Sequence, residues 1–226
     1  MTISLIILAV MMAIFGGWLF SHSLNVRPWE STQTAETGTY GHPRHLPPAA
    51  TAERVGLAVF LAVVISLFAL SISAYLMRMD MGHDWRSVPV PGLLWANSVF
   101  LLLGSLALQW AWSSARRGQR DALRTGLWLG GGFTIAFMVG QMLAWQQLEA
   151  AGYSLPANPA NAFFFLMTGL HALHLLGGLV AWARTLFKVL GGADTQKVRA
   201  SVELCALYWH FLLVVWAILF ILLLMT

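Results

Sequence analysis

The chain has 226 residues, of which 58% are hydrophobic and 10% are charged, and its mean hydropathy is +0.71. This composition excludes an ordinary soluble globular domain and predicts a membrane protein. The formal net charge of +4 does not indicate nucleic-acid binding, because in a multi-pass membrane protein the meaning of basic residues depends on which loops hold them.

Six apolar runs are long enough to cross a hydrocarbon core of ~30 Å as helices. They lie at residues 2–20, 55–77, 92–113, 123–147, 161–187 and 203–225. Strands of a membrane barrel would alternate polar and apolar residues over ~10 residues, whereas these runs are apolar on nearly every side. The sequence therefore predicts an all-α membrane protein with six transmembrane helices, a five-helix bundle within residues 55–226 plus one extra N-terminal helix.

Residues 1–20 are predicted to be a transmembrane helix and not a signal peptide, because no Lys or Arg precedes the apolar run and no small-x-small cleavage site ends it. Residues 21–54 are rich in Thr, Pro, Gly and His and are predicted to be a cytoplasmic linker. His42 and His45 lie in this linker, but a metal site there is the weaker interpretation, because no Cys or carboxylate stands at ligand spacing.

The basic residues fall in alternate loops. All 13 Lys and Arg residues except Arg78 and Arg86 lie in the loops after the first, third and fifth runs or, as Arg124 and Arg184 do, at the ends of runs that border these loops. These three loops share one side of the membrane, and the positive-inside rule makes that side cytoplasmic. Both termini are therefore predicted to be periplasmic.

Polar side chains within the spans are costly in lipid and face the bundle interior by default. Those that the sequence singles out are Asn97, Gln141, Thr168, His171, His174, Glu203, Tyr208 and His210. His171 and His174 share a face of the 161–187 helix, with Thr168 one turn before. At ~1.5 Å per residue His174 and His210 lie at the same depth. We therefore expect a hydrogen-bonded cluster of the three histidines, extended by Tyr208 and Glu203.

Three interpretations compete for this cluster. It can join the last two helices, each hydrogen bond contributing ~0.5–2 kcal/mol. It can hold haem or a metal ion, although a second histidine pair on a facing helix is missing. It can relay protons, although the candidate carboxylate, Glu203, lies at the cytoplasmic mouth and not at mid-depth. A serine hydrolase built on Ser105 is disfavoured, because no histidine lies near its depth on the 92–113 or 123–147 helix.

Five sequence blocks resemble, in chain order, subunit III of the haem-copper oxidases, in particular cytochrome c oxidase. They are RVGLAVFLAVVISLFALSISAY (54–75), VPVPGLLWANSVFLLLGSLAL (88–108), FTIAFMVGQMLAWQQLEAAG (133–152), FFFLMTGLHALHLLGG (163–178) and VELCALYWHFLLVVWAILF (202–220). The resemblance covers about residues 54–226. Asn97 lies in the second block, Gln141 in the third, and the histidines in the last two.

The resemblance implies a non-catalytic subunit of an aerobic respiratory complex in the bacterial inner membrane. Subunits I and II of this family carry the haems and copper, while subunit III packs on subunit I, holds phospholipid between its helices and sustains proton uptake. This chain is then expected to bind no metal or haem of its own, and its histidines are expected to be structural. Its expected partners are subunits I and II, membrane lipids and a small accessory subunit near the 2–20 helix.

Two positions depart from the family pattern. Val64 and Leu213 stand where many members carry a carboxylate within the membrane. The electron donor is left open, so subunit III of a quinol oxidase and the auxiliary protein of nitric oxide reductase are alternatives within the family. A haem-binding membrane cytochrome is the alternative of a different class.

Overall fold

The computed structural model describes residues 52–81, 85–86, 88–89, 91–155 and 158–225. These residues form five α-helices, each long and apolar enough to cross a membrane. The all-α class and the five spans of the predicted bundle are confirmed. The predicted helix within residues 1–20 and most of the linker, with His42 and His45, lie outside the described residues.

The five helices are longer than the apolar runs that predicted them. They are α2 (Ala52–Met81), α3 (Leu93–Arg116), α4 (Arg120–Ala150), α5 (Pro159–Leu190) and α6 (Thr195–Met225). The 31 residues of α4 extend over about 46 Å, more than a hydrocarbon core of ~30 Å requires. The apolar run therefore marks only the middle of each helix. α2 begins within the predicted 21–54 linker, and Glu53 in its first turn suits the positive end of the helix dipole.

The chain divides into two compact units, Met1–Leu76 and Met77–Thr226. The described part of the first unit is α2 up to Leu76. Its buried side chains Leu61, Val64, Phe68, Ile72 and Tyr75 recur every three or four residues and form one stripe along the helix.

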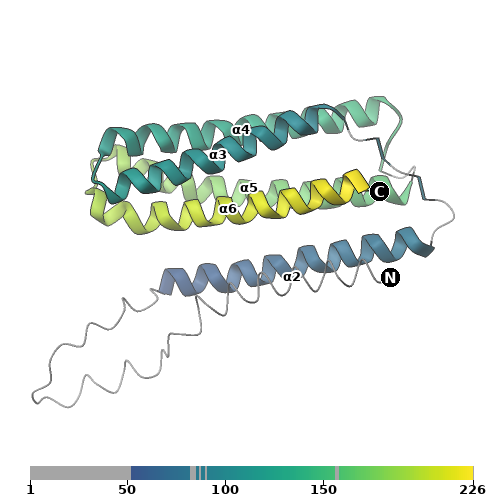
Figure 1. The fold of residues 1–226 in the computed structure, drawn as a ribbon, viewed down its shortest axis with the longest axis horizontal. Coiled ribbons are helices and arrows are strands. Elements are labelled where there is room, and N and C mark those ends of the chain that lie inside the picture. Colours follow the sequence, from purple (N-terminus) through teal and green to yellow (C-terminus); the bar gives the residue numbers. More distant parts are fainter. Residues whose placement is uncertain (1–51, 82–84, 87, 90, 156–157, 226) are drawn as a thin grey trace, which may run out of the picture. The chain divides into compact units, whose positions relative to one another are not determined.

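The second unit is an up-and-down bundle of α3, α4, α5 and α6 (Figure 1). α3 packs against α4 and α6, and α5 packs against the same two helices. Short connections make consecutive helices antiparallel neighbours. The core of the bundle holds large side chains that are almost fully buried, among them Trp209, Trp216, Phe137 and Phe164.

Glycine ends three of these helices. Gly118, Gly152 and Gly192 have φ of 72°, 89° and 78°, the left-handed region in which a side chain is strained. At each site the next residue donates its backbone N–H to a carbonyl five residues earlier, as Gln119 does to Ser114 at 3.0 Å. α5 begins two residues before the predicted run, because the Asn158 side chain accepts the Ala160 N–H at 3.1 Å and Pro159 takes the first turn.

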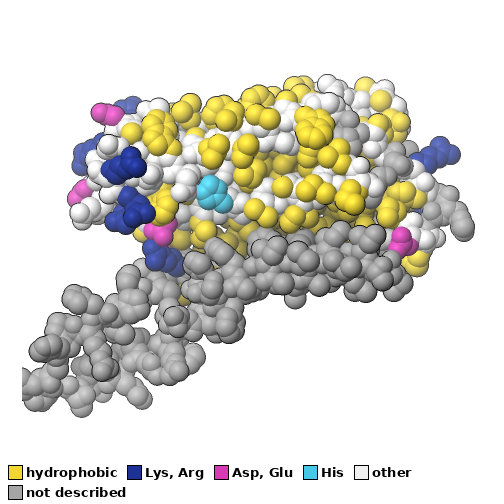
Figure 2. Space-filling view, in the orientation of Figure 1, with side chains coloured by type: hydrophobic (Ala, Val, Ile, Leu, Met, Phe, Trp, Pro, Cys, Tyr) yellow, Lys and Arg dark blue, Asp and Glu magenta, His cyan; other side chains and the backbone are white. Residues whose placement is uncertain are grey.

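The α3–α4 and α5–α6 connections lie at the same end of the bundle, and exposed basic side chains gather there (Figure 2, dark blue). Those described are Arg116, Arg117, Arg120, Arg124, Arg184, Lys188 and Arg199. The structure thus brings together the basic residues of two loops that the sequence assigned to one side.

Candidate functional site

The polar side chains of the bundle interior make a network of hydrogen bonds between helices. In three cases an indole N–H donates to a hydroxyl on another helix: Trp209 to Thr134 at 2.8 Å, Trp216 to Ser98 at 2.9 Å and Trp145 to Thr168 at 3.1 Å. Each hydroxyl in turn donates to the carbonyl four residues earlier on its own helix, at 2.7–2.8 Å. A hydroxyl can do both, because it is a donor and an acceptor. These bonds join α4 to α6, α3 to α6 and α4 to α5.

A fourth indole reaches a backbone carbonyl directly. Trp182 of α5 donates to the Leu127 carbonyl of α4 at 2.8 Å. Its ring lies over Gly131, where an added Cβ would stand 2.0 Å from the ring. Gly131 therefore admits the indole to the α4 backbone, which is the close approach expected of small residues between membrane helices.

Two buried amides link α3 to α4. Asn97 Nδ2 donates to Gln141 Oε1 at 3.4 Å, and the two side chains are 0% and 1% exposed. The neighbouring Gly140 makes room for them, since a Cβ there would stand 2.0 Å from Asn97 Oδ1. The structure thus brings together two of the polar residues that the sequence singled out on separate helices.

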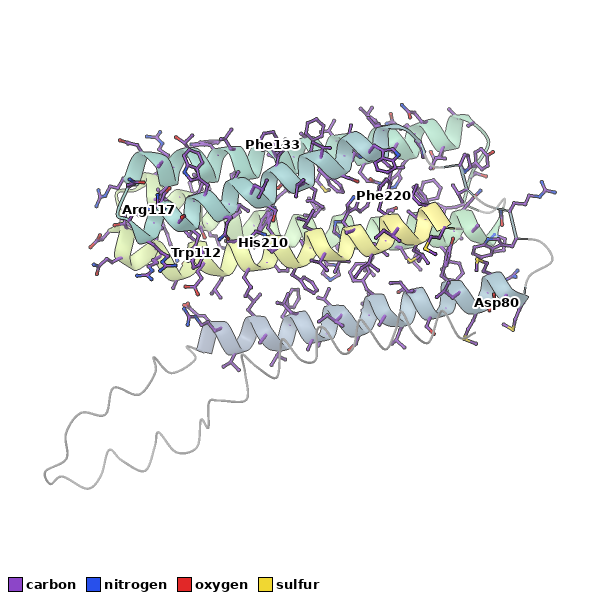
Figure 3. All side chains as sticks on the ribbon, viewed as in Figure 1. Asp80, Trp112, Arg117, Phe133, His210 and Phe220 are labelled. Carbon is purple, nitrogen blue, oxygen red and sulfur yellow. The ribbon has the colours of Figure 1, made fainter. Side chains whose placement is uncertain are left out.

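His210 is a residue of α6 whose side chain bonds residues of α3 (Figure 3). Its Nδ1 hydrogen-bonds the Ser105 hydroxyl, and its Nε2 hydrogen-bonds Gln109 Oε1 at 2.9 Å. With the Gln109 amide in this orientation, Nε2 of the neutral ring donates to Oε1, and Nδ1 accepts from the Ser105 hydroxyl. His210 therefore fixes α6 against α3.

The expected cluster of His171, His174 and His210 is not formed as predicted, because the hydrogen bonds of His210 go to α3 and not to α5. The residue of α6 that faces α5 is Tyr208, whose hydroxyl donates to the His174 backbone carbonyl at 2.9 Å. Tyr208 and His210 are two residues apart, or about 200° around the helix at 3.6 residues per turn. Tyr208 therefore lies level with His174, while His210 faces a different neighbour.

The two histidines of α5 differ in their surroundings. His171 is fully buried and packs against Phe137 and Trp216, whose ring centroids lie 5.9 and 5.3 Å from its own and 4.9 Å from each other. His174 is partly exposed, and its Nδ1 bonds the Leu170 carbonyl at 2.7 Å on the same helix. Glu203 is partly buried near the start of α6.

A serine hydrolase built on Ser105 stays disfavoured, but for a different reason. A histidine does reach Ser105, and it comes from α6 and not from the two helices considered above. The arrangement still cannot act on a substrate, because Ser105 is 1% exposed and the group on the second ring nitrogen is a neutral amide, not the carboxylate that stabilises an imidazolium. Within the described part of the chain, no three His, Cys, Asp or Glu side chains come together as metal ligands.

Ser98, Thr134 and Gln109 are members of the network that sequence reasoning missed. Ser and Thr in helices commonly bond their own i−4 carbonyl, so they carry little signal as partners of another helix. For the two hydroxyls the available signal was the number of tryptophans, 11 in the chain, because each buried indole N–H needs an acceptor.

Comparison with known proteins identifies the family. The model of the family described as cytochrome c oxidase subunit III matches residues 5–225, a span that includes the N-terminal run and the linker. The probable cytochrome c oxidase subunit 3 of Mycobacterium bovis is 28% identical over 170 residues, which are 74% of this chain and 84% of the relative.

Two further relatives agree. The cytochrome c oxidase subunit 3 of Synechocystis is 28% identical over 82% of this chain and 77% of its own length. The probable cytochrome c oxidase subunit 3 of Mycobacterium leprae is 30% identical over 74% of this chain and 84% of its own length. The chain therefore belongs to the cytochrome c oxidase subunit III family.

Proposed function

We propose that this chain is a non-catalytic subunit III of a haem-copper terminal oxidase of the cytochrome c type, in which it stabilises subunit I, binds phospholipid and supports proton uptake. The observation that carries the proposal is the family match over residues 5–225. The network of the bundle supports it, since the mid-membrane polar side chains hydrogen-bond one another across helices and hold the bundle together.

A redox role for the histidines has less support. Haem bound by two imidazoles needs them on facing helices with their nitrogens free to ligate iron. Both nitrogens of His210 bond α3 side chains, and the His171 ring is enclosed in the core against the rings of Phe137 and Trp216. We therefore propose that Asn97, Gln141, His171, His174, Glu203, Tyr208 and His210 serve the structure of the bundle.

The surface of the bundle suits a neighbour in the membrane. Large apolar side chains are exposed along its helices, such as Leu106 of α3, Val139 of α4 and Leu173 of α5, and hydrophobic side chains cover much of the face in Figure 2 (yellow). Lipid and the flank of subunit I are apolar surfaces that can cover them. The exposed basic end is proposed to be cytoplasmic, where it attracts anionic headgroups, and both termini are then periplasmic. A small accessory subunit is proposed to contact the 2–20 segment.

The proposed support of proton uptake does not use carboxylates at positions 64 and 213, where the family resemblance leads one to expect them. Val64 is buried in α2 and Leu213 is partly buried in α6, and neither side chain can bind a proton. Any contribution of this subunit to proton uptake therefore does not involve a proton-binding side chain at these two positions.

Purification of the tagged chain in mild detergent tests the proposal. We expect subunits I and II to co-purify with their haems, and we expect the isolated chain to show no Soret absorption. A Soret band at one haem per chain would indicate the haem-binding cytochrome instead. Co-purification with a quinol oxidase or a nitric oxide reductase would assign the chain to another complex of the superfamily.

A further inference from the structure

The side-chain amides of Asn97 on α3 and Gln141 on α4 each keep one polar atom without a hydrogen bond to the described part of the chain. Asn97 and Gln141 share one hydrogen bond, while Asn97 Oδ1 and Gln141 Nε2 have no hydrogen-bond partner among the described residues. Both atoms are buried. Each is bonded to the same amide carbon as the atom that makes the hydrogen bond, so the two flank one contact.

Rotating either amide, or both, does not give these two atoms a hydrogen-bond partner. Turning the Asn97 amide by 180° would set two acceptors against each other, and turning the Gln141 amide would set two donors against each other. Turning both restores one hydrogen bond and again leaves one donor and one acceptor. In every arrangement the pair therefore presents an acceptor and a donor that need a third group.

The third group must donate to one amide and accept from the other, and it must be small. The two side chains are 0% and 1% exposed, so no side chain or lipid headgroup from outside reaches them without parting α3 from α4. Water meets all three conditions. Buried waters in proteins typically occupy such positions, where they bond polar groups that would otherwise be unsatisfied.

We propose that Asn97 and Gln141 bind an internal water molecule, which completes the polar contact between α3 and α4. Gly140 contributes to this site by having no Cβ, since a Cβ there would stand 2.0 Å from Asn97 Oδ1 and displace the amide. The site makes α3 and α4 a hydrated pair at this level of the membrane. It depends on the geometry of the bundle and not on the identity of the electron donor.

A density map of the intact complex tests the site, at a resolution at which other buried waters are visible. We expect an isolated peak at hydrogen-bonding distance, ~2.7–3.2 Å, from one atom of each amide. A map that resolves other buried waters but shows no peak here would overturn the proposal. So would a side chain of another segment or subunit in contact with the two amides.

A pair of matched variants tests whether the amides bind the water molecule that produces the peak. Gln141→Met keeps a similar volume and removes the donors, so the peak should disappear while other buried waters stay. Gln147→Met makes the same change at an exposed position of the same helix and should leave the peak in place. A peak that survives Gln141→Met would refute the assignment. If Gln141→Met does not assemble, the map of the unchanged complex still decides.

Discussion

Replacement of Gly140 by alanine should separate α3 from α4. The added Cβ would lie 2.0 Å from Asn97 Oδ1 and 2.9 Å from its Cγ, so the amide must leave its place and lose its hydrogen bond to Gln141. Overpacking of a core costs ~1–3 kcal/mol, and a buried polar group left without a partner costs ~1–3 kcal/mol. The better helix propensity of alanine offsets ~1 kcal/mol. The net destabilisation is therefore expected to be roughly 1–5 kcal/mol.

Gly132→Ala is the matched control, because it makes the same change on the same helix at an exposed position with no atom within 4 Å of the new Cβ. The assay is the temperature at which the subunit is lost from the purified complex, measured at one heating rate for both variants. Gly140→Ala should lower this temperature, and Gly132→Ala should leave it unchanged or raise it slightly. Equal behaviour of the two variants would refute the packing argument.

Two further predictions concern His210 and the orientation of the chain. His210→Ala removes the partner of the buried Ser105 hydroxyl, which is expected to destabilise the subunit by ~1–3 kcal/mol. Subunit occupancy of the purified complex should therefore fall, while oxygen consumption per assembled complex persists. Full occupancy with abolished turnover would contradict a structural role. For orientation, Thr37→Cys and Ser154→Cys are labelled in intact cells with an impermeant thiol reagent, and the native Cys205 is buried and does not compete. Label should enter at residue 154 and not at residue 37, and the reverse pattern would overturn the predicted topology.

The sequence was sufficient for the membrane class and the five described spans. Length and hydrophobicity decide these features, because a span must be apolar over the thickness of the bilayer whatever its neighbours are. It was also sufficient to expect Asn97 and Gln141 in the interior, since a buried amide is costly in lipid.

The partners of the polar side chains could not be predicted in the same way. Depth along a helix follows from counting residues, and this placed His210 level with the α5 histidines. The neighbour that a side chain faces depends on rotation about the helix axis and on the order of helices around the bundle. Here α6 contacts both α3 and α5. Tyr208 faces α5, and His210 faces α3. A single sequence does not specify how far each helix is rotated about its axis in the bundle.

The hydroxyl-bound indoles have a consequence for sliding between helices. In lipid, apolar side chains gain little by choosing one apolar partner over another, so they resist a shift of one helix along its neighbour only through shape. Trp209 and Trp216 are seven residues apart on α6 and bond hydroxyls on two different helices. A shift of α6 by one residue would move both indoles by ~1.5 Å and turn them by about 100°, and both bonds would break together. The two tryptophans therefore fix the register of α6 against α3 and α4 at once.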